Sequence, residues 1–361
     1  MQKIVSIQYL RAIAAILVVM VHYVNTFREK FIPGSFRFDI GGYGVDIFFV
    51  ISGYIMYAIC KARSPTPAAF MKNRILRIVP LYWVLTIFAA FVSTSNGVSV
   101  SFDIDFAALI KSLLFIPEWH HKYTEQVAPV LLVGWTLNLE MAFYLVFAVS
   151  LAFPRRIGIA LVLLTLVAMG TAREWSEPLH ALVYAPEPNA AAVLYTKPII
   201  LEFAAGILIG MIFTNAVVAQ WMAAHLKAML VLACGLTVVS ILWLVDRPDM
   251  ASGNRFLRLG VPATMLVTAA LLAEPFLARF RFRLLELLGD ASYSIYLTHL
   301  MAMPVVYALI GTKAALTAPL LALGAQIACA VAIGVLVYIL VEHPLTQMTK
   351  GRPPFRRFSQ A

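Results

Sequence analysis

The sequence predicts an all-α membrane protein, a polytopic bundle of about ten transmembrane helices with cytoplasmic N- and C-termini. Hydrophobic residues make up 61% of the 361 positions and charged residues only 13%, which is far from the composition of soluble globular domains. Apolar stretches near the length that crosses a bilayer as a helix recur along the whole chain. Lys and Arg gather in alternate connections between these stretches.

Ten stretches are candidate spans. They lack the weak alternating pattern of an outer-membrane β-barrel. We expect one transmembrane domain over residues 1–345 and a short basic cytoplasmic tail over 346–361. The predicted spans are residues 5–26, 42–60, 77–95, 130–152, 157–172, 193–214, 227–245, 259–277, 290–310 and 318–341.

Basic residues predict the orientation of the chain. The connection 61–76, the segments after the fourth and eighth spans and the tail are rich in Lys and Arg, whereas the opposite connections hold as many acids as bases. Cytoplasmic connections are normally the basic ones, so both termini are predicted to be cytoplasmic. This topology also explains the net charge of +10 without a nucleic acid partner. The three cysteines show no CxxC spacing, so we predict no disulfide framework and no metal site.

The first span carries two ionisable residues, Arg11 and His22, eleven positions apart. That spacing returns to nearly the same helix face about 16 Å further along. Ionisable groups inside a membrane usually face protein or a water-filled cavity and mark a functional site. One alternative is that Arg11 extends its side chain to the cytoplasmic lipid headgroups and that His22 only packs against neighbouring helices. The other is a signal peptide, but its apolar core would be shorter and would not be interrupted by an arginine.

The second span opens with the glycine-rich segment GGYGVDIFFVISGY, residues 41–54. Glycines there permit close helix approach or an irregular start of the helix. Asp46 lies at a depth similar to that of His22, where a carboxylate would fix the histidine tautomer and stabilise the imidazolium. The alternative is an interfacial Asp46 that faces outer water.

The fourth span places Glu140 near the bilayer midplane, after Trp135 and Asn138 and one turn before Tyr144. A buried glutamate must be protonated or paired with a cation such as Arg11. An interhelical clamp explains Glu140 as well as a catalytic role does.

The ninth span carries His299 in the segment SYSIYLTH, residues 292–299, which includes Tyr296. We expect His299 to line a cavity or to bond a neighbouring helix. Glu202 and Glu274 are also intramembrane, and the sequence assigns them no role.

On the predicted cytoplasmic side, Arg74 and Arg77 approach the third span one helical turn apart, in MKNRILRIVP. Arginines at that spacing can grip phosphate oxygens with forked donors. The alternative is that Arg74 and Arg77 only contribute to the excess of positive charge that is typical of cytoplasmic connections. On the opposite side, connections 96–129 and 173–192 are rich in aromatic and polar residues, which suits sugar rings but also an interfacial aromatic belt.

Together these residues resemble the acyltransferase-3 family of integral-membrane acyltransferases, which modify bacterial surface carbohydrates. The start of the first span, IQYLR, is similar to the exopolysaccharide-production branch and lacks the acid of the commoner Leu-Asp-Gly-Leu-Arg pattern. The features that carry the resemblance are the Arg-x10-His pair Arg11 and His22, the segment 44–54, the RxxR pair Arg74 and Arg77, and, more weakly, residues 135–144, residues 292–299 and Glu342-His343-Pro344.

The resemblance implies acetyl-coenzyme A, or a donor of a similar short acyl group, as co-substrate, with no permanently bound cofactor. His22 would be the general base that deprotonates a glycan hydroxyl, with an acyl-histidine intermediate as the alternative route. The predicted site residues are His22, Asp46 and Glu140 as catalytic groups, Arg11, Arg74 and Arg77 as acyl-coenzyme A contacts, and Trp135, Asn138, Tyr144, Tyr296 and His299 as cavity-lining groups, with Asn138 and Tyr144 also considered as oxyanion donors.

The implied acceptor is a bacterial exopolysaccharide, a related surface glycan or a lipid-linked oligosaccharide, handled in the bacterial inner membrane among its lipids, with polysaccharide assembly proteins as further partners. Two other functions fit some of the same features. A transporter or flippase of lipid-linked sugars would also bury ionisable residues among ten spans. A non-catalytic partner in polysaccharide assembly is the other possibility, but it would not need Arg11 and His22 on one face of the first span. Binding of coenzyme A distinguishes the acyltransferase from both.

Overall fold

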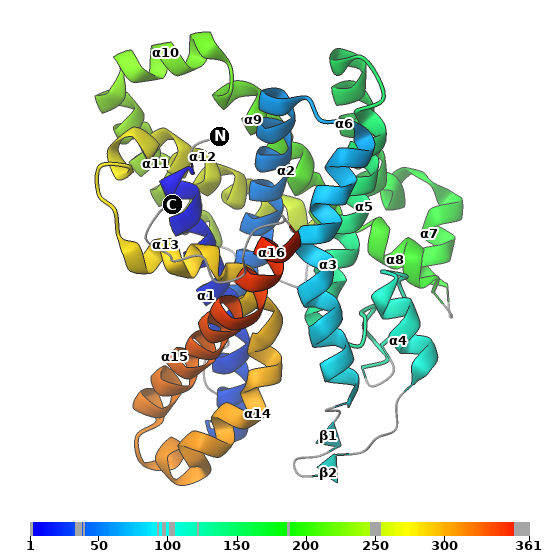
Figure 1. The fold of residues 1–361 in the computed structure, drawn as a ribbon, viewed down its shortest axis with the longest axis vertical. Helices are drawn as coiled ribbons and strands as arrows, with labels where there is room; N and C mark the ends of the chain where they lie inside the picture. The colour runs from blue at the N-terminus through cyan, green and yellow to red at the C-terminus, as the bar shows by residue number, and fades with distance from the viewer. Residues whose placement is uncertain are drawn as a thin grey trace. The chain divides into compact units, whose positions relative to one another are not determined.

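The computed structural model describes residues 3–32, 38, 40–91, 94–95, 99–100, 105–120, 123–185, 188–245 and 254–349. Over these residues the chain is almost entirely helical (Figure 1), as predicted. Nine of the described helices are long and apolar enough to cross a membrane, and one bent helix pair makes a tenth span when it is counted as one. The chain is therefore a multi-pass helical membrane protein. Most of the predicted tail, 350–361, lies outside the described residues.

The elements follow one another along the chain as coloured in Figure 1. The first half comprises α1 (Val5–Phe31), η1 (Ile40–Gly42), α2 (Tyr43–Arg63), α3 (Pro67–Phe91), β1 (Thr94–Ser95), β2 (Ser99–Val100), α4 (Phe106–Leu113), η2 (Leu132–Gly134), α5 (Trp135–Ser150) and α6 (Arg155–Trp175). The second half comprises α7 (Glu177–Tyr184), α8 (Ala190–Tyr195), η3 (Pro198–Ile200), α9 (Leu201–Phe213), α10 (Ala216–Ala224), α11 (Leu226–Val245), η4 (Phe256–Gly260), α12 (Val261–Leu277), α13 (Arg283–Asp290), α14 (Ser292–Thr317), α15 (Pro319–Val337), η5 (Tyr338–Glu342) and α16 (His343–Thr349). Strands β1 and β2 form a short antiparallel pair.

The sixth predicted span, 193–214, differs from the structure at both ends. The apolar helix begins only at Pro198, and after Phe213 the chain bends by 71° into α10. Asn215 starts the new helix because its side chain accepts a hydrogen bond from the amide of Val217. Lys197, which precedes Pro198, therefore lies outside the span.

The third predicted span, 77–95, begins too late. Helix α3 already starts at Pro67 and contains both Arg74 and Arg77. Proline is well tolerated in the first turn of a helix, and no breaker follows it until Pro80 inside the helix. The two arginines consequently lie on a helix, and the connection from α2 to α3 is short.

Two compact units are interleaved along the chain. The first unit contains residues 1–21, 38–67 and 142–290, and the second contains 22–37, 68–141 and 291–361. Helices α1 and α5 therefore contribute to both units.

In the first unit, α2 packs against α9 and α12, and α11 packs against α12. A β-carbon added at Gly53 of α2 would clash with the carbonyl oxygen of Phe203, and one at Gly206 of α9 would clash with that of Val50. Glycine thus permits the close approach that the sequence predicted for α2. The surrounding core is formed by apolar residues of α1, α2, α9 and α12.

In the second unit, α14 and α15 form an antiparallel pair. Gly334 of α15 lies so close to Ile295 of α14 that a β-carbon would come within 2.6 Å of the Ile295 Cα. Helix α14 is interrupted at Gly311, whose φ of 74° favours glycine. Phe27 of α1 packs with Ala315 and Ala322 of this pair, so the end of α1 is held by the hairpin.

Candidate active site

Two imidazoles face each other in the second unit. The rings of His22 on α1 and His299 on α14 are stacked, with centroids 5.0 Å apart and planes inclined by 22°. His299 is fully buried and His22 is partly buried. The sequence predicted both residues as site residues on separate spans, and the structure brings them together.

The hydrogen bonds of His299 define its tautomer. Its Nδ1 lies 2.6 Å from the carbonyl oxygen of Tyr296, and because a carbonyl can only accept, Nδ1 carries the hydrogen. Nε2 of the neutral ring is then an acceptor, and it has no hydrogen-bond partner among the described residues. Tyr23 fixes the same turn by donating to the carbonyl oxygen of His299 at 3.1 Å. The site therefore contains a buried basic nitrogen held in a defined orientation.

The start of α5 packs against the Tyr296 turn. The Tyr296 hydroxyl lies 2.9 Å from Thr136 Oγ1 and donates to the carbonyl oxygen of Val133 at 3.1 Å. Nearby in sequence, Asn138 is only 1% exposed, and its Oδ1 has no hydrogen-bond partner in the described part of the chain. A buried amide oxygen without a partner is rare in proteins, which keeps Asn138 among the candidate ligand contacts.

A second polar group in this unit involves α3, α5, α14 and η5. The Tyr293 hydroxyl donates to the carbonyl oxygen of Ile78 at 2.8 Å, and Ser294 Oγ donates to Glu342 at 2.6 Å. The charged groups that act electrostatically on Tyr293 are Glu342, Glu140 and Arg77. Thus Arg77 and Glu140, predicted from separate motifs, belong to one neighbourhood.

The sequence reasoning did not assign roles to Tyr293 and Glu342. The signal was present, because Tyr293 lies in SYSIYLTH and Glu342 in the terminal Glu342-His343-Pro344, two of the three segments that carry the weaker part of the family resemblance. The bond between Ser294 and Glu342 joins these two segments directly. Arg74 is partly buried and Arg77 is exposed on α3, so Arg77 is the more accessible of the two cations.

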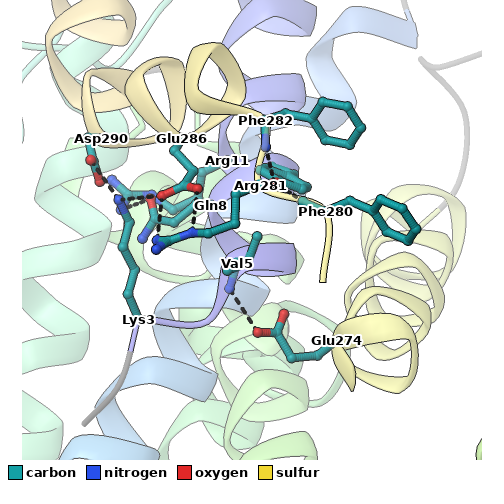
Figure 2. A network of polar contacts seen from close by, with 11 residues as sticks. Lys3, Val5, Gln8, Arg11, Glu274, Phe280, Arg281, Phe282, Glu286 and Asp290 are labelled. Atoms are coloured by element: carbon teal, nitrogen blue, oxygen red, sulfur yellow. Dashed lines mark hydrogen bonds and ion pairs between the residues drawn. The ribbon is translucent and has the colours of Figure 1, made fainter. Parts of the chain in front are cut away.

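Arg11 belongs to the first unit, near a polar network at the N-terminus of α1 (Figure 2). Its Nη1 lies 3.5 Å from Gln8 Oε1, one turn earlier on α1. Around this turn, Lys3 contacts Asp290 at 2.7 Å and Arg281 pairs with Glu286 at 3.0 Å. Arg11 is therefore placed beside the charged end of α1 and is partly buried.

Glu274 caps this end of α1, as Figure 2 shows for Val5. Its two carboxylate oxygens accept hydrogen bonds from the amides of Val5 and Ser6 at 2.9 and 2.7 Å. Free amide groups and the positive end of the helix dipole make a carboxylate favourable there. Glu274 is thus a structural cap for the helix that carries Arg11 and His22, a role that the sequence did not indicate.

Asp46 has a partner that sequence reasoning missed. Its carboxylate accepts two hydrogen bonds from Arg255, at 2.8 and 3.2 Å, and is completely buried. It does not face water as an interfacial cap would.

Tyr144, predicted to line a cavity, is buried in the first unit, and the centroid of its ring lies 5.6 Å from that of Phe143. The remaining predicted cavity-lining residues all belong to the second unit: Trp135, Asn138, Tyr296 and His299.

A many-spanning helical protein with intramembrane imidazoles and a charged, capped first helix is a candidate membrane enzyme, and comparison with known proteins defines its class. The family model described as an acyltransferase domain matches residues 4–340, so the chain belongs to the acyltransferase-3 family and is an acyltransferase. Among the described residues, no group of three or more His, Cys, Asp and Glu side chains could hold a metal ion.

Two curated relatives support this assignment. The exopolysaccharide production protein ExoZ of Rhizobium meliloti (strain 1021) is 35% identical over 324 residues, covering 88% of this chain and 93% of the relative. Acyltransferase MdmB of Streptomyces mycarofaciens is 26% identical over 348 residues, covering 87% and 83%. No solved structure matches the chain.

Proposed function

We propose that this chain transfers an acetyl or similar short acyl group from acyl-coenzyme A to a hydroxyl of a bacterial exopolysaccharide or related surface glycan. The stacked His22 and His299 pair is the observation that carries this proposal. The name of the relative ExoZ supports the acceptor class. The protein would act in the bacterial inner membrane with both termini cytoplasmic, as the basic connections favour.

In the proposed reaction, an imidazole nitrogen of His22 removes the proton from the acceptor hydroxyl. The hydroxyl oxygen attacks the thioester carbon, a C–O bond forms, and the C–S bond breaks. The imidazolium then returns the proton to the departing thiolate of coenzyme A, so the enzyme ends unchanged. A general base of this kind contributes typically 10²–10⁴-fold to a rate.

His299 would act as a positioning residue for His22. Because its Nδ1–H is committed to the Tyr296 carbonyl, its ring cannot rotate without losing that hydrogen bond. A fixed neutral ring at stacking distance restricts the orientation of His22. Asn138 remains our candidate donor to the oxyanion of the tetrahedral intermediate.

Arg74 and Arg77 would hold the phosphates of the donor. They are one turn apart on α3, and Arg77 is an exposed residue. Arginine donors form strong, charge-assisted bonds to phosphate oxygens. Arg11, on the same helix as His22, would contact the pantetheine arm of the donor. Glu140 would stabilise the polar residues around Tyr293, on which it acts electrostatically.

The test is thermal melting of the purified full chain with coenzyme A and acetyl-coenzyme A. A ligand that binds only the folded protein at 100 times its Kd stabilises it by about 2.7 kcal/mol. We expect the wild type and a matched Lys72→Ala control, which removes an exposed cation of α3, to shift in melting temperature. The Arg74→Ala/Arg77→Ala variant should shift much less. A wild type that does not respond to millimolar donor would contradict the proposal.

A further inference from the structure

Two side chains of the second unit carry buried polar atoms that have no part in the reaction described above. They are Tyr307 of α14 and Gln326 of α15, two helices that pack against each other (Figure 1). The Tyr307 hydroxyl and Gln326 Oε1 are buried, and neither has a hydrogen-bond partner among the described residues. Gln326 as a whole is only 1% exposed. Buried polar atoms are rarely left in this condition in a native protein.

Tyr307 lies beside the C-terminal part of α1. Its ring is stacked with that of Tyr23, with centroids 6.4 Å apart and planes inclined by 25°. The ring of Phe31 lies 6.4 Å away, and the ammonium of Lys30 lies 5.1 Å from the Tyr307 centroid. The hydroxyl of Tyr23 donates in turn to the carbonyl oxygen of His299. Tyr23 thus links Tyr307 to the stacked histidines, and the Tyr307 hydroxyl is the part of this side chain that remains unused.

Gln326 belongs to the face of α15 that packs against α14. Buried residues recur along α15 at intervals of four and so share one face: Ala322, Gln326, Ala330 and Gly334. At one end of this face, Ala322 belongs to the hydrophobic cluster against which Tyr307 packs. At the other end, Gly334 lies against Ile295 of α14. Gln326 therefore lies between the levels of Tyr307 and Ile295, the part of α14 that includes His299.

Helices α1, α14 and α15 meet around these polar atoms. Cys329 of α15, three residues after Gln326, is close enough to Tyr23 of α1 to act on it electrostatically. His299 Nε2 is a further buried atom of α14 without a hydrogen-bond partner in the described part of the chain. An imidazole nitrogen, a phenol and an amide oxygen are therefore all unsatisfied along one helix contact. Each is unfavourable in the free protein, and a bound molecule with matching groups would satisfy them.

The hydrogen-bonding capacity of these groups suits a sugar hydroxyl. Gln326 Oε1 can only accept a hydrogen bond, whereas the Tyr307 hydroxyl can donate and accept. A sugar hydroxyl also donates and accepts, so it can pair with either group. An ionised phosphate or carboxylate has only acceptors, and an acyl chain has neither donors nor acceptors. Both would leave Gln326 Oε1 unsatisfied, which is costly.

We propose that Tyr307 and Gln326 form an acceptor subsite that binds hydroxyls of a sugar next to the sugar that is acylated. Tyr307 is eight residues from His299, about 12 Å along a helix. This distance is too long for contact with a hydroxyl that reacts at the histidine pair, so the sugar in the subsite is a neighbour of the reacting one. The ligand is therefore an oligomeric glycan. Its identity as the acyl acceptor rests on the proposed function.

The order of residues along α1 separates the acceptor subsite from the proposed donor contacts. Arg11, the proposed contact of the pantetheine arm, precedes His22 on α1, whereas Phe31, which packs near Tyr307, follows His22. The donor would thus approach His22 from the N-terminal part of α1 and the acceptor from the C-terminal part. This arrangement would bring the thioester and the hydroxyl to His22 from opposite directions.

The first test is thermal melting of the ligand-free full chain. Removing a buried hydroxyl that has no partner relieves an unfavourable state, whereas removing one that is bonded loses a stabilising contact. We expect Tyr307→Phe and Gln326→Met to melt at the wild-type temperature or above it. The matched control Tyr43→Phe removes a buried hydroxyl that is bonded to Ser240, so it should melt lower. A Tyr307→Phe variant that melted as low as Tyr43→Phe would show that the hydroxyl serves the fold, and would overturn the subsite.

The second test is the kinetics of acyl transfer from acetyl-coenzyme A by the purified full chain. The acceptor is the unacylated surface glycan, extracted together with its lipid-linked precursors from cells that lack this protein. We expect Tyr307→Phe and Gln326→Met each to raise the KM for the glycan about two- to tenfold, the value of one neutral hydrogen bond. The KM for acetyl-coenzyme A should not change. Tyr43→Phe should retain both KM values.

The outcomes separate the acceptor subsite from the proposed function. An unchanged KM for the glycan in both variants would overturn the subsite and leave the acyltransferase proposal standing. A raised KM for acetyl-coenzyme A in place of the glycan would show that Tyr307 and Gln326 contact the amides of the pantetheine arm, and would overturn their assignment to the acceptor. A wild type that transfers no acyl group to the extract would contradict the proposed function and the acceptor assignment together.

Discussion

The two compact units use polar residues in different ways. In the first unit, Asp46 is paired with Arg255, and Glu274 accepts hydrogen bonds from the first amides of α1. In the second unit, His22, His299 and Asn138 lie within helices, and two of these retain polar atoms without partners among the described residues. Paired charges fix helix ends, whereas unused hydrogen-bonding capacity remains available to a substrate. The comparison predicts that substitutions in the second unit impair catalysis and that those in the first unit impair stability.

The largest expected effect is that of His22→Ala in the second unit. Loss of a general base should lower acyl transfer by about 10²–10⁴-fold. The melting shift caused by acetyl-coenzyme A should persist, because the proposed contacts to the donor phosphates are Arg74 and Arg77 of α3 and do not include His22. A variant that still transferred acyl groups at the wild-type rate would exclude His22 as the base.

The ion pair of the first unit should give the largest effect on stability. Arg255→Ala leaves Asp46 buried without its partner, and breaking a buried pair typically costs about 3–5 kcal/mol. Because Arg255 is 38% exposed, we expect roughly 2–3 kcal/mol, measured as a lower melting temperature. The double variant Asp46→Asn/Arg255→Gln should recover much of the loss. If it did not, the pair would not be the cause.

His299→Gln tests the positioning role within the second unit. Glutamine can still donate to a carbonyl but does not provide a stacked ring, so we expect about a tenfold lower kcat, of order 1.4 kcal/mol, with KM for the donor unchanged. His299→Phe, which keeps a ring but loses the Tyr296 bond, should also be impaired. Normal kcat in both variants would show that His299 only fills space.

Glu274→Ala tests whether a substitution in the first unit lowers stability without impairing catalysis. Loss of a carboxylate cap from a helix start costs about 0.5–2 kcal/mol, here the cap on the amides of Val5 and Ser6. We expect a lower melting temperature and nearly normal kcat. Glu286→Ala, which removes the acid that pairs with the exposed Arg281, should have a smaller effect, because an ion pair with one partner in solvent contributes little.

The sequence predicted the spans because they depend on local patterns of apolar residues. Ionisable residues within the spans made His22, Glu140 and His299 candidate site residues, and the structure brings His22 and His299 together. Helix boundaries were less predictable, since Pro67 allows α3 to begin before the arginines. Partners could not be predicted, because Asp46 and Arg255 are 209 positions apart and their contact depends on how α2 packs beside η4.

The smallest expected effect is the pH dependence of folding stability at Lys197, which directly precedes η3 in the first unit. Burial, together with Arg255 and Arg173, lowers the pKa of Lys197 to about 8 from its ordinary value near 10.5. Between pH 8 and 10.5 the unfolded chain binds more protons at this residue, so its contribution to folding stability rises with pH. Ligand-free melting that fell across this range in the wild type, but not in Lys197→Gln, would contradict the lowered pKa.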